Sequence, residues 1–169
     1  MKKETNKIRN LTLAGIMASL ICIFTAYICH IPIGINGGYV HFGDALIYLA
    51  AVLLPAPYAM VAAAVGGGLA DLLTAPMWFP ATVIIKALIV IPFSNKTKKI
   101  VSLRNIIATV IAYLISGFGY FLAEYFIFGT WAVIWVSLLQ SLIQSAGSAL
   151  FFIVLGNALD KANVKTRLM

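Results

Sequence analysis

The chain has 169 residues, of which 62% are hydrophobic and 10% are charged, and its mean hydropathy is +1.00. A soluble domain carries roughly 25% charged residues, so this composition excludes an ordinary soluble protein and indicates an integral membrane protein. A helix needs about 20 apolar residues to cross roughly 30 Å of hydrocarbon. We therefore expect residues 1–169 to form one domain, an all-α bundle of about six transmembrane helices, with no separate soluble domain.

Short segments rich in proline and glycine divide the chain into apolar runs. Proline lacks the N–H that a helix interior requires, so "IPIGINGG" after His30, "PAP" at 55–57 and "APMWFP" at 75–80 are predicted to separate helices. The basic "SNKTKK" and the short "GTW" mark the two remaining breaks. The first run is too long for the apolar core of a signal peptide, so we expect a span rather than a cleaved leader. The six spans are expected at about 8–31, 42–54, 58–74, 81–93, 105–128 and 132–159.

The positions of lysine and arginine predict how the bundle is oriented. Six spans place both termini and the connection between the fourth and fifth spans on one side. The three connections on the other side, at 32–41, 75–80 and 129–131, contain no lysine or arginine, so both termini are expected in the cytoplasm. The net charge of +7 is then a topology signal, and we expect no nucleic-acid partner. The cytoplasmic cations are Lys2, Lys3, Lys7, Arg9, Lys96, Lys98, Lys99, Arg104, Lys161, Lys165 and Arg167, which leaves Lys86 within a span.

Four charged residues fall within or at the border of the predicted spans, where a charge is costly and usually faces a cavity or a partner. Asp44 begins the second span, and Asp71 and Glu124 lie about one turn from the outer ends of the third and fifth spans. Lys86 lies roughly 8 to 10 Å below the outer start of the fourth span, at 1.5 Å per residue. Unrelated ion pairs have no reason to share a level. Charges from four helices at one level therefore predict a polar pocket that opens to the outside.

Further polar and aromatic residues are predicted at the same level. The first outer loop contributes Asn36, Tyr39 and His41, and the second contributes Trp78. Tyr120 lies one helical turn below Glu124, and Gln140 shares a face of the sixth span with Gln144. Ligand sites of this kind combine apolar and aromatic walls with a few orienting polar groups. The expected substrate-binding residues are Asn36, Tyr39, His41, Asp44, Asp71, Trp78, Lys86, Tyr120, Glu124 and Gln144.

Each of these residues also has a purely structural interpretation that the sequence leaves open. The structural alternatives are an interhelical pair for Asp71 with Lys86, an interaction with the helix dipole for Asp44, a solvent-wetted interface position for Glu124, an interface position without a ligand role for His41, an aromatic belt at headgroup level for Tyr39, Trp78 and Trp131, and helix–helix hydrogen bonds for Gln140 and Gln144. The shared level makes the whole set a stronger indication than any single member.

Motifs of enzymes and metal sites are absent from the sequence. There is no Walker-type loop, no HExxH, and no histidine or cysteine cluster with metal-ligand spacing. The glycines of "VGGGLAD" lie within a span, where small residues let helices pack closely, and Cys22 and Cys29 are expected to be small buried hydrophobic residues. We therefore expect no enzyme activity, no catalytic residues, no metal and no cofactor. A stand-alone small carrier or channel and a membrane enzyme acting on a lipid remain alternative functions.

Two stretches resemble the substrate-binding (S) components of energy-coupling factor (ECF) vitamin transporters, in particular the riboflavin-type group. "YVHFGDALIYLAAVLLPAPYAMVAAAVGGGLADLL" is similar to the second and third helices of that family, with Gly-Asp after the first loop and a glycine-rich stretch that ends in aspartate. "LAGIMASL" places Ala14 and Ala18 in an A-x-x-x-A pattern similar to the family motif that docks on the coupling protein. The resemblance extends over essentially the whole chain through its size, six spans and basic cytoplasmic ends.

The resemblance implies a multi-pass protein of a prokaryotic plasma membrane that captures a small vitamin at the outer face. It also implies that a separate transmembrane coupling protein, facing Ala14 and Ala18, and two ATPase subunits deliver the vitamin inward. The substrate that we favour is a vitamin B6 vitamer such as pyridoxine or pyridoxamine, followed by hydroxymethylpyrimidine or riboflavin. A small aromatic heterocycle with hydroxyl groups suits aromatic walls and carboxylate, histidine and lysine partners.

Overall fold

The computed structural model describes residues 2–28, 30–32, 39–131 and 134–168. Within these ranges most residues are helical, which confirms the predicted all-α fold. The elements in chain order are α1 (Lys2–Ile23), the π-helical η1 (Phe24–Ile28), β1 (Ile31–Pro32), β2 (Tyr39–Val40), α2 (Asp44–Leu53), α3 (Ala56–Thr74), the 3₁₀-helical η2 (Pro76–Trp78), α4 (Phe79–Leu88), α5 (Leu103–Phe128), α6 (Ile134–Lys161) and α7 (Val164–Leu168).

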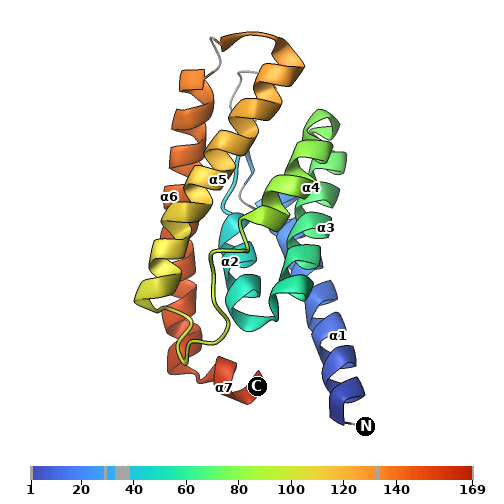
Figure 1. Ribbon diagram of the computed structural model, residues 1–169, viewed down its shortest axis with the longest axis vertical. Coiled ribbons are helices and arrows are strands. Elements are labelled where there is room, and N and C mark those ends of the chain that lie inside the picture. The colour runs from blue at the N-terminus through green and yellow to red at the C-terminus, as the bar shows by residue number, and fades with distance from the viewer. Residues whose placement is uncertain (1, 29, 33–38, 132–133, 169) are drawn as a thin grey trace.

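The helices form one bundle in which the short α2 is packed between longer helices. Figure 1 shows α1, α3 and α4 together on one flank and α5 and α6 on the other, and α2 contacts α1, α3 and α6. Both ends of the chain lie at the same end of the bundle, together with the connection between α4 and α5. The opposite end carries the α3–α4 and α5–α6 connections.

The helices that could cross a membrane are not equal in length. Within the described residues, four are long and apolar enough to span: Asn6–Ile28, Ala56–Thr74, Leu103–Phe128 and Leu138–Lys161. The predicted second and fourth spans instead contain α2 and α4, with 10 residues each, which is about 15 Å or half of the hydrocarbon thickness. Pro55 follows the end of α2, and the residues after Leu88 form turns. Four long helices and two half-length ones therefore occupy the positions of the six predicted spans.

The half-length α2 is enclosed by protein. Its sequence, DALIYLAAVL, is apolar on nearly every side, and all of its residues from Asp44 to Val52 are buried. A helix that is apolar all round is typical of the interior of a bundle. Because α2 begins with Asp44, this packing brings a carboxylate into the interior.

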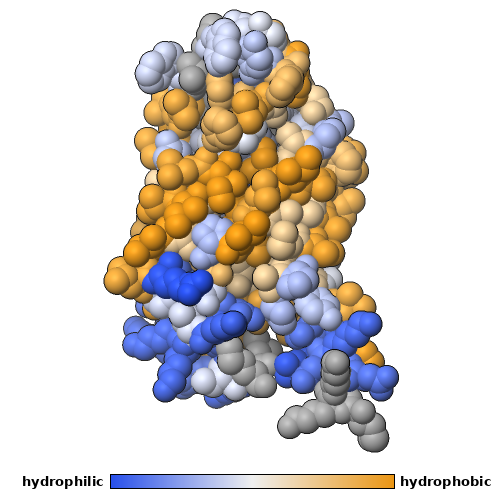
Figure 2. Space-filling model, viewed as in Figure 1, coloured by the Kyte–Doolittle hydropathy of each residue, from blue (hydrophilic) through white to orange (hydrophobic). Residues whose placement is uncertain are grey.

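The outer surface of the long helices is apolar. Figure 2 shows a broad hydrophobic band across the middle of the visible face, and hydrophilic residues gathered at the end that carries both termini. Exposed side chains on these helices include Leu114, Phe118 and Leu150, at 60%, 63% and 65% exposure. Soluble proteins rarely have contiguous apolar surfaces of this extent, whereas lipid tails are a suitable solvent for them. The chain is a multi-pass membrane protein.

α1 and α3 approach each other closely because both carry small residues at their contact. A Cβ added at Gly66 of α3 would lie 2.6 Å from the carbonyl oxygen of Ala18. Ala14 and Ala18 are only 5% and 9% exposed and belong to the hydrophobic core. Both alanines therefore pack within the chain here, and their contact with a coupling protein stays a prediction. The small residues that α1 exposes are Gly15 and Ser19.

Replacing Gly66 by alanine is expected to destabilise the protein. The added methyl group overlaps the Ala18 carbonyl and forces α1 and α3 apart, and overpacking of this kind costs about 1 to 3 kcal/mol. The matched control is Gly15→Ala on α1, where an added Cβ meets nothing within 4 Å. Thermal unfolding in detergent should show a lower midpoint for Gly66→Ala and an equal or higher midpoint for Gly15→Ala. Equal midpoints for the two variants would contradict the close α1–α3 contact.

Candidate substrate-binding site

An ion pair and a side-chain amide join three helices inside the bundle. Lys86 Nζ of α4 lies 2.6 Å from Asp44 Oδ1 at the start of α2, and Gln144 Nε2 of α6 donates to Asp44 Oδ2 at 3.1 Å. Asp44 and Lys86 are 0% and 1% exposed. Charges so deeply buried are tolerated when they are paired and hydrogen-bonded. We call these three side chains the polar network, and it holds α2, α4 and α6 together.

Asp44 has two roles at the same position. It is the first residue of α2, where a carboxylate complements the positive end of the helix dipole. The N-cap is Gly43, which makes no side-chain cap, and both carboxylate oxygens of Asp44 accept hydrogen bonds from other helices. The interaction with the helix dipole is therefore real but does not by itself explain why a carboxylate is placed here.

Asp71 and a glycine of α3 contribute to the surroundings of Lys86. Asp71 is 4% exposed and interacts electrostatically with Lys86, whose short ion pair is with Asp44. A Cβ added at Gly67 would lie 3.0 Å from Lys86 Cγ. The glycine-rich stretch therefore leaves room for the lysine stem, in agreement with the packing role predicted for it, and Asp71 adds a second negative charge nearby.

A further polar contact joins α4 to α5. The hydroxyl oxygens of Thr82 and Tyr120 are 2.8 Å apart, and Lys86 Nζ lies 5.4 Å from the centroid of the Tyr120 ring, within cation–π range. Thr82 is 2% exposed and precedes Lys86 by one helical turn, so the two side chains share a face of α4. Thr82 was not among the expected site residues. Its i, i+4 spacing from Lys86 could have indicated that it shares the same helix face.

Aromatic rings and two unpartnered polar atoms lie next to the polar network. Trp78 of η2 packs at 6.2 Å between ring centroids against both Tyr120 and Phe128. Trp78 is 6% exposed, and Glu124, one turn along α5 from Tyr120, is 5% exposed, so it is not the solvent-wetted interface residue of the structural alternative. Within the described residues, neither Trp78 Nε1 nor Glu124 Oε2 has a hydrogen-bond partner. A buried donor and acceptor left unsatisfied cost free energy, which a ligand bound to both would offset.

The segment that leads into α2 contains the buried His41, which is 5% exposed. Gly43 N–H donates to His41 Nδ1 at 3.1 Å, so the neutral imidazole carries its proton on Nε2. Ile31 of β1 pairs with Val40 of β2, and this register places His30 opposite His41. His41 is therefore enclosed by protein, and its role in binding stays a prediction.

Two further expected site residues, besides His41, belong to the segment between α1 and α2. Asn36 lies outside the described residues. Tyr39 is part of β2 and pairs with Pro32. The roles of Asn36 and Tyr39 in binding stay predictions. The expected residues that the structure joins through contacts are Asp44, Lys86, Gln144, Tyr120 and Trp78. Asp71, Glu124 and His41 are also buried.

Three aromatic rings close the polar network on the side of the chain termini. Tyr48 follows Asp44 by one turn of α2 and stacks on Phe93 at 4.9 Å between ring centroids. Both rings meet the edge of Phe152, at 5.9 and 6.0 Å. Ser148, one turn before Phe152 on α6, is completely buried, and its hydroxyl has no partner in the part of the chain that the structure describes. These rings lie between the polar network and the end of the bundle that carries the chain termini.

Replacing Lys86 by methionine is expected to destabilise the protein by about 3 to 5 kcal/mol, because the Asp44 carboxylate stays buried without its counter-charge. The matched control is Lys99→Met, at an exposed position between α4 and α5. Thermal unfolding in detergent should show a large loss for Lys86→Met and none for Lys99→Met. Combining Lys86→Met with Asp44→Asn should recover part of the loss, whereas additive losses would show that the two side chains are not coupled.

Comparison with known proteins identifies the family. The family described as "ECF-type riboflavin transporter, S component" matches residues 5–161. A protein of Pyrococcus woesei, known as "Uncharacterized protein in gap 3'region", is 34% identical over 108 residues, which cover 62% of this chain and 72% of that protein. S components are the substrate-specific subunits of ECF transporters and are not enzymes. The match over nearly the whole chain shows that this protein belongs to the ECF-type S-component family.

Proposed function

We propose that the protein is the substrate-specificity subunit of an ECF-type importer. It captures a small water-soluble vitamin outside a prokaryotic cell and delivers it inward together with a membrane coupling protein and two ATPase subunits. Family membership supports this function. The observation that carries it is the polar network next to Trp78 and Glu124, whose buried Nε1 and Oε2 have no partner among the described residues and suit a ligand with its own donors and acceptors.

A vitamin B6 vitamer is the substrate that we favour. Its single aromatic ring suits packing against Trp78 and Tyr120, which already form an aromatic wall. The indole N–H of Trp78 donates to a ring nitrogen or an oxygen of the vitamin, and the Glu124 carboxylate accepts from a hydroxyl or an amine. Hydroxymethylpyrimidine offers similar groups and is the second candidate. Riboflavin, the substrate in the family's name, is the third.

We also propose that the chain has six membrane segments with both termini in the cytoplasm. The basic residues at the end that carries both termini support this orientation through the positive-inside rule. The vitamin then enters from the opposite end, where η2 and the α5–α6 connection lie. The coupling protein is expected to dock on α1 at Ala14 and Ala18, with the exposed Gly15 and Ser19 beside them.

Replacing Trp78 by phenylalanine is expected to weaken vitamin binding by about 10-fold, because the change removes one hydrogen-bond donor and keeps an aromatic ring. The matched control is Trp135→Phe, at a residue that is 78% exposed. Isothermal titration calorimetry with pyridoxine, hydroxymethylpyrimidine and riboflavin gives the affinity of each variant. If Trp78→Phe binds the vitamin of the unmodified protein with unchanged affinity, Trp78 does not donate a hydrogen bond to it.

Uptake of the vitamin is expected to require ATP hydrolysis. Proteoliposomes that contain this chain with an ECF coupling module should accumulate labelled vitamin with internal ATP, on the side of the ATPases, and stop when hydrolysis is blocked. Native mass spectrometry of the protein purified from rich medium should reveal the mass of the co-purified vitamin. Accumulation by the chain alone, driven by an ion gradient, would instead support a stand-alone carrier, and turnover of a lipid would support an enzyme.

A further inference from the structure

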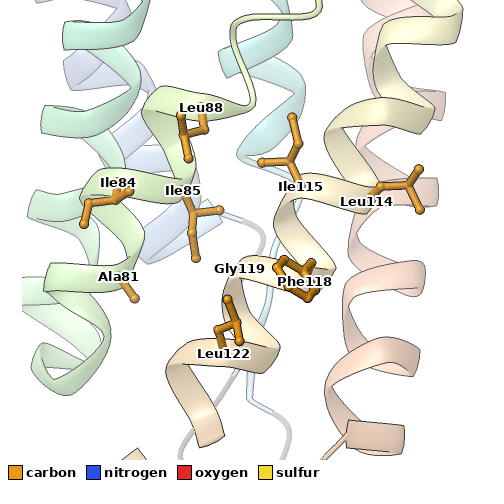
Figure 3. A pocket seen from close by; sticks show the side chains of 9 residues that line it. All are labelled: Ala81, Ile84, Ile85, Leu88, Leu114, Ile115, Phe118, Gly119 and Leu122. Carbon is orange, nitrogen blue, oxygen red and sulfur yellow. The ribbon is translucent and has the colours of Figure 1, made fainter. Parts of the chain in front are cut away.

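A groove runs along the surface between α4 and α5, outside the polar network. Its volume is about 630 Å³, and the side chains that line it are apolar. Figure 3 shows Ile85 of α4 and Gly119 of α5 facing each other between the two helices, with Leu88 toward one end of the groove and Leu122 toward the other. No polar group on this lining can orient a water-soluble vitamin.

The residues at the bottom of the groove also separate it from the polar network. A Cβ added at Gly119 would lie 2.7 Å from Ile85 Cγ1, so the two helices touch there. The next residue on each helix, Tyr120 and Lys86, is part of the buried polar contacts. Whatever fills the groove lies on the membrane side of the contact that shields Lys86.

The groove opens toward lipid. Ile84, Leu114 and Phe118 line it and are 62%, 60% and 63% exposed. α5 has 26 residues and is long enough to span the hydrocarbon, whereas α4 ends after 10, so on the side of α4 part of α5 has no helix beside it. Water in such a groove finds no hydrogen-bond partners, and an empty groove loses dispersion contacts. A flexible apolar chain is the occupant that this shape and chemistry accept.

Positive charge is concentrated where α4 and α5 are joined. The connection carries Lys96, Lys98 and Lys99, α5 has Arg104 as its second residue, and all four side chains are exposed. Among the described residues, none of the four forms a salt bridge with a carboxylate. Asp160, the acidic residue beside this connection, is already hydrogen-bonded to two backbone N–H groups. The four cations are therefore available to an anion at the membrane surface.

We propose that the groove binds an acyl chain of an anionic phospholipid whose headgroup lies at these four cations. Leu114 follows Arg104 by about 15 Å along α5, at 1.5 Å per residue. This distance equals half of the hydrocarbon thickness, so an acyl chain anchored at the headgroup level reaches the groove. A zwitterionic lipid fills the groove equally well but lacks the net charge that the four cations attract.

Competition between two lipids with identical acyl chains tests this proposal. The full-length protein is purified in detergent, supplied with equal amounts of phosphatidylglycerol and phosphatidylcholine, and examined by native mass spectrometry. We expect phosphatidylglycerol to be retained at least about fivefold more than phosphatidylcholine, the factor that one juxtamembrane cation contributes. The combined change of Lys96, Lys98, Lys99 and Arg104 to glutamine should abolish this preference. Leu114→Trp, which fills the groove, should lower retention of both lipids, whereas Leu150→Trp, at a 65% exposed position on α6, should not.

Three results would overturn the proposal. Equal retention of the two lipids by the unmodified protein would show that it has no site selective for an anionic headgroup. Equal retention by Leu114→Trp and the unmodified protein would show that the lipid binds at the headgroup level without entering the groove. Equal loss in Leu114→Trp and Leu150→Trp would show a general effect of tryptophan on the lipid-facing surface. Circular dichroism of each variant verifies that the helices are intact, and none of these readouts depends on the vitamin.

Discussion

The buried ion pair of Lys86 and Asp44 determines how the helices around it pack. Neither charge is tolerated in an apolar bundle without the other, so α4 has to approach the start of α2 closely enough for a 2.6 Å contact. Gly67 on α3 leaves space for the lysine stem, and Gln144 on α6 supplies a hydrogen bond to the second carboxylate oxygen. One interaction thus constrains four helices, and the vitamin site that we propose is built beside it.

The two half-length helices are the ones that carry this pair. α2 begins with Asp44, and α4 ends two residues after Lys86. Helix ends leave backbone groups without intrahelical partners, and hydrocarbon cannot satisfy them, so such ends require protein around them. Leu54 and Ile89, just beyond these helices, are 1% and 0% exposed. The long helices face lipid and, in doing so, allow the two short helices to end inside the bundle.

Depth along a helix could be predicted from the sequence, whereas direction around its axis could not. Counting residues from the predicted span ends placed Asp44 and Lys86 at one level, and the structure brings them into contact, although their role in binding stays a prediction. The i, i+4 spacing of Ala14 and Ala18 identified a helix face, but a spacing does not say whether α3 or another protein covers it. Thr82 was missed because a single hydroxyl in an apolar run gives no sign of burial until its spacing from Lys86 is considered.

The packed rings of Tyr48, Phe93 and Phe152 affect whether ions can pass through the bundle. They lie across the bundle between Asp44 and the end that carries the chain termini, where Tyr48 and Phe152 are 1% and 0% exposed. An ion that passed this layer would have to shed its hydration shell in surroundings as apolar as the lipid, at a cost of tens of kcal/mol by Born solvation. The ring layer therefore opposes the passage of ions through this part of the bundle.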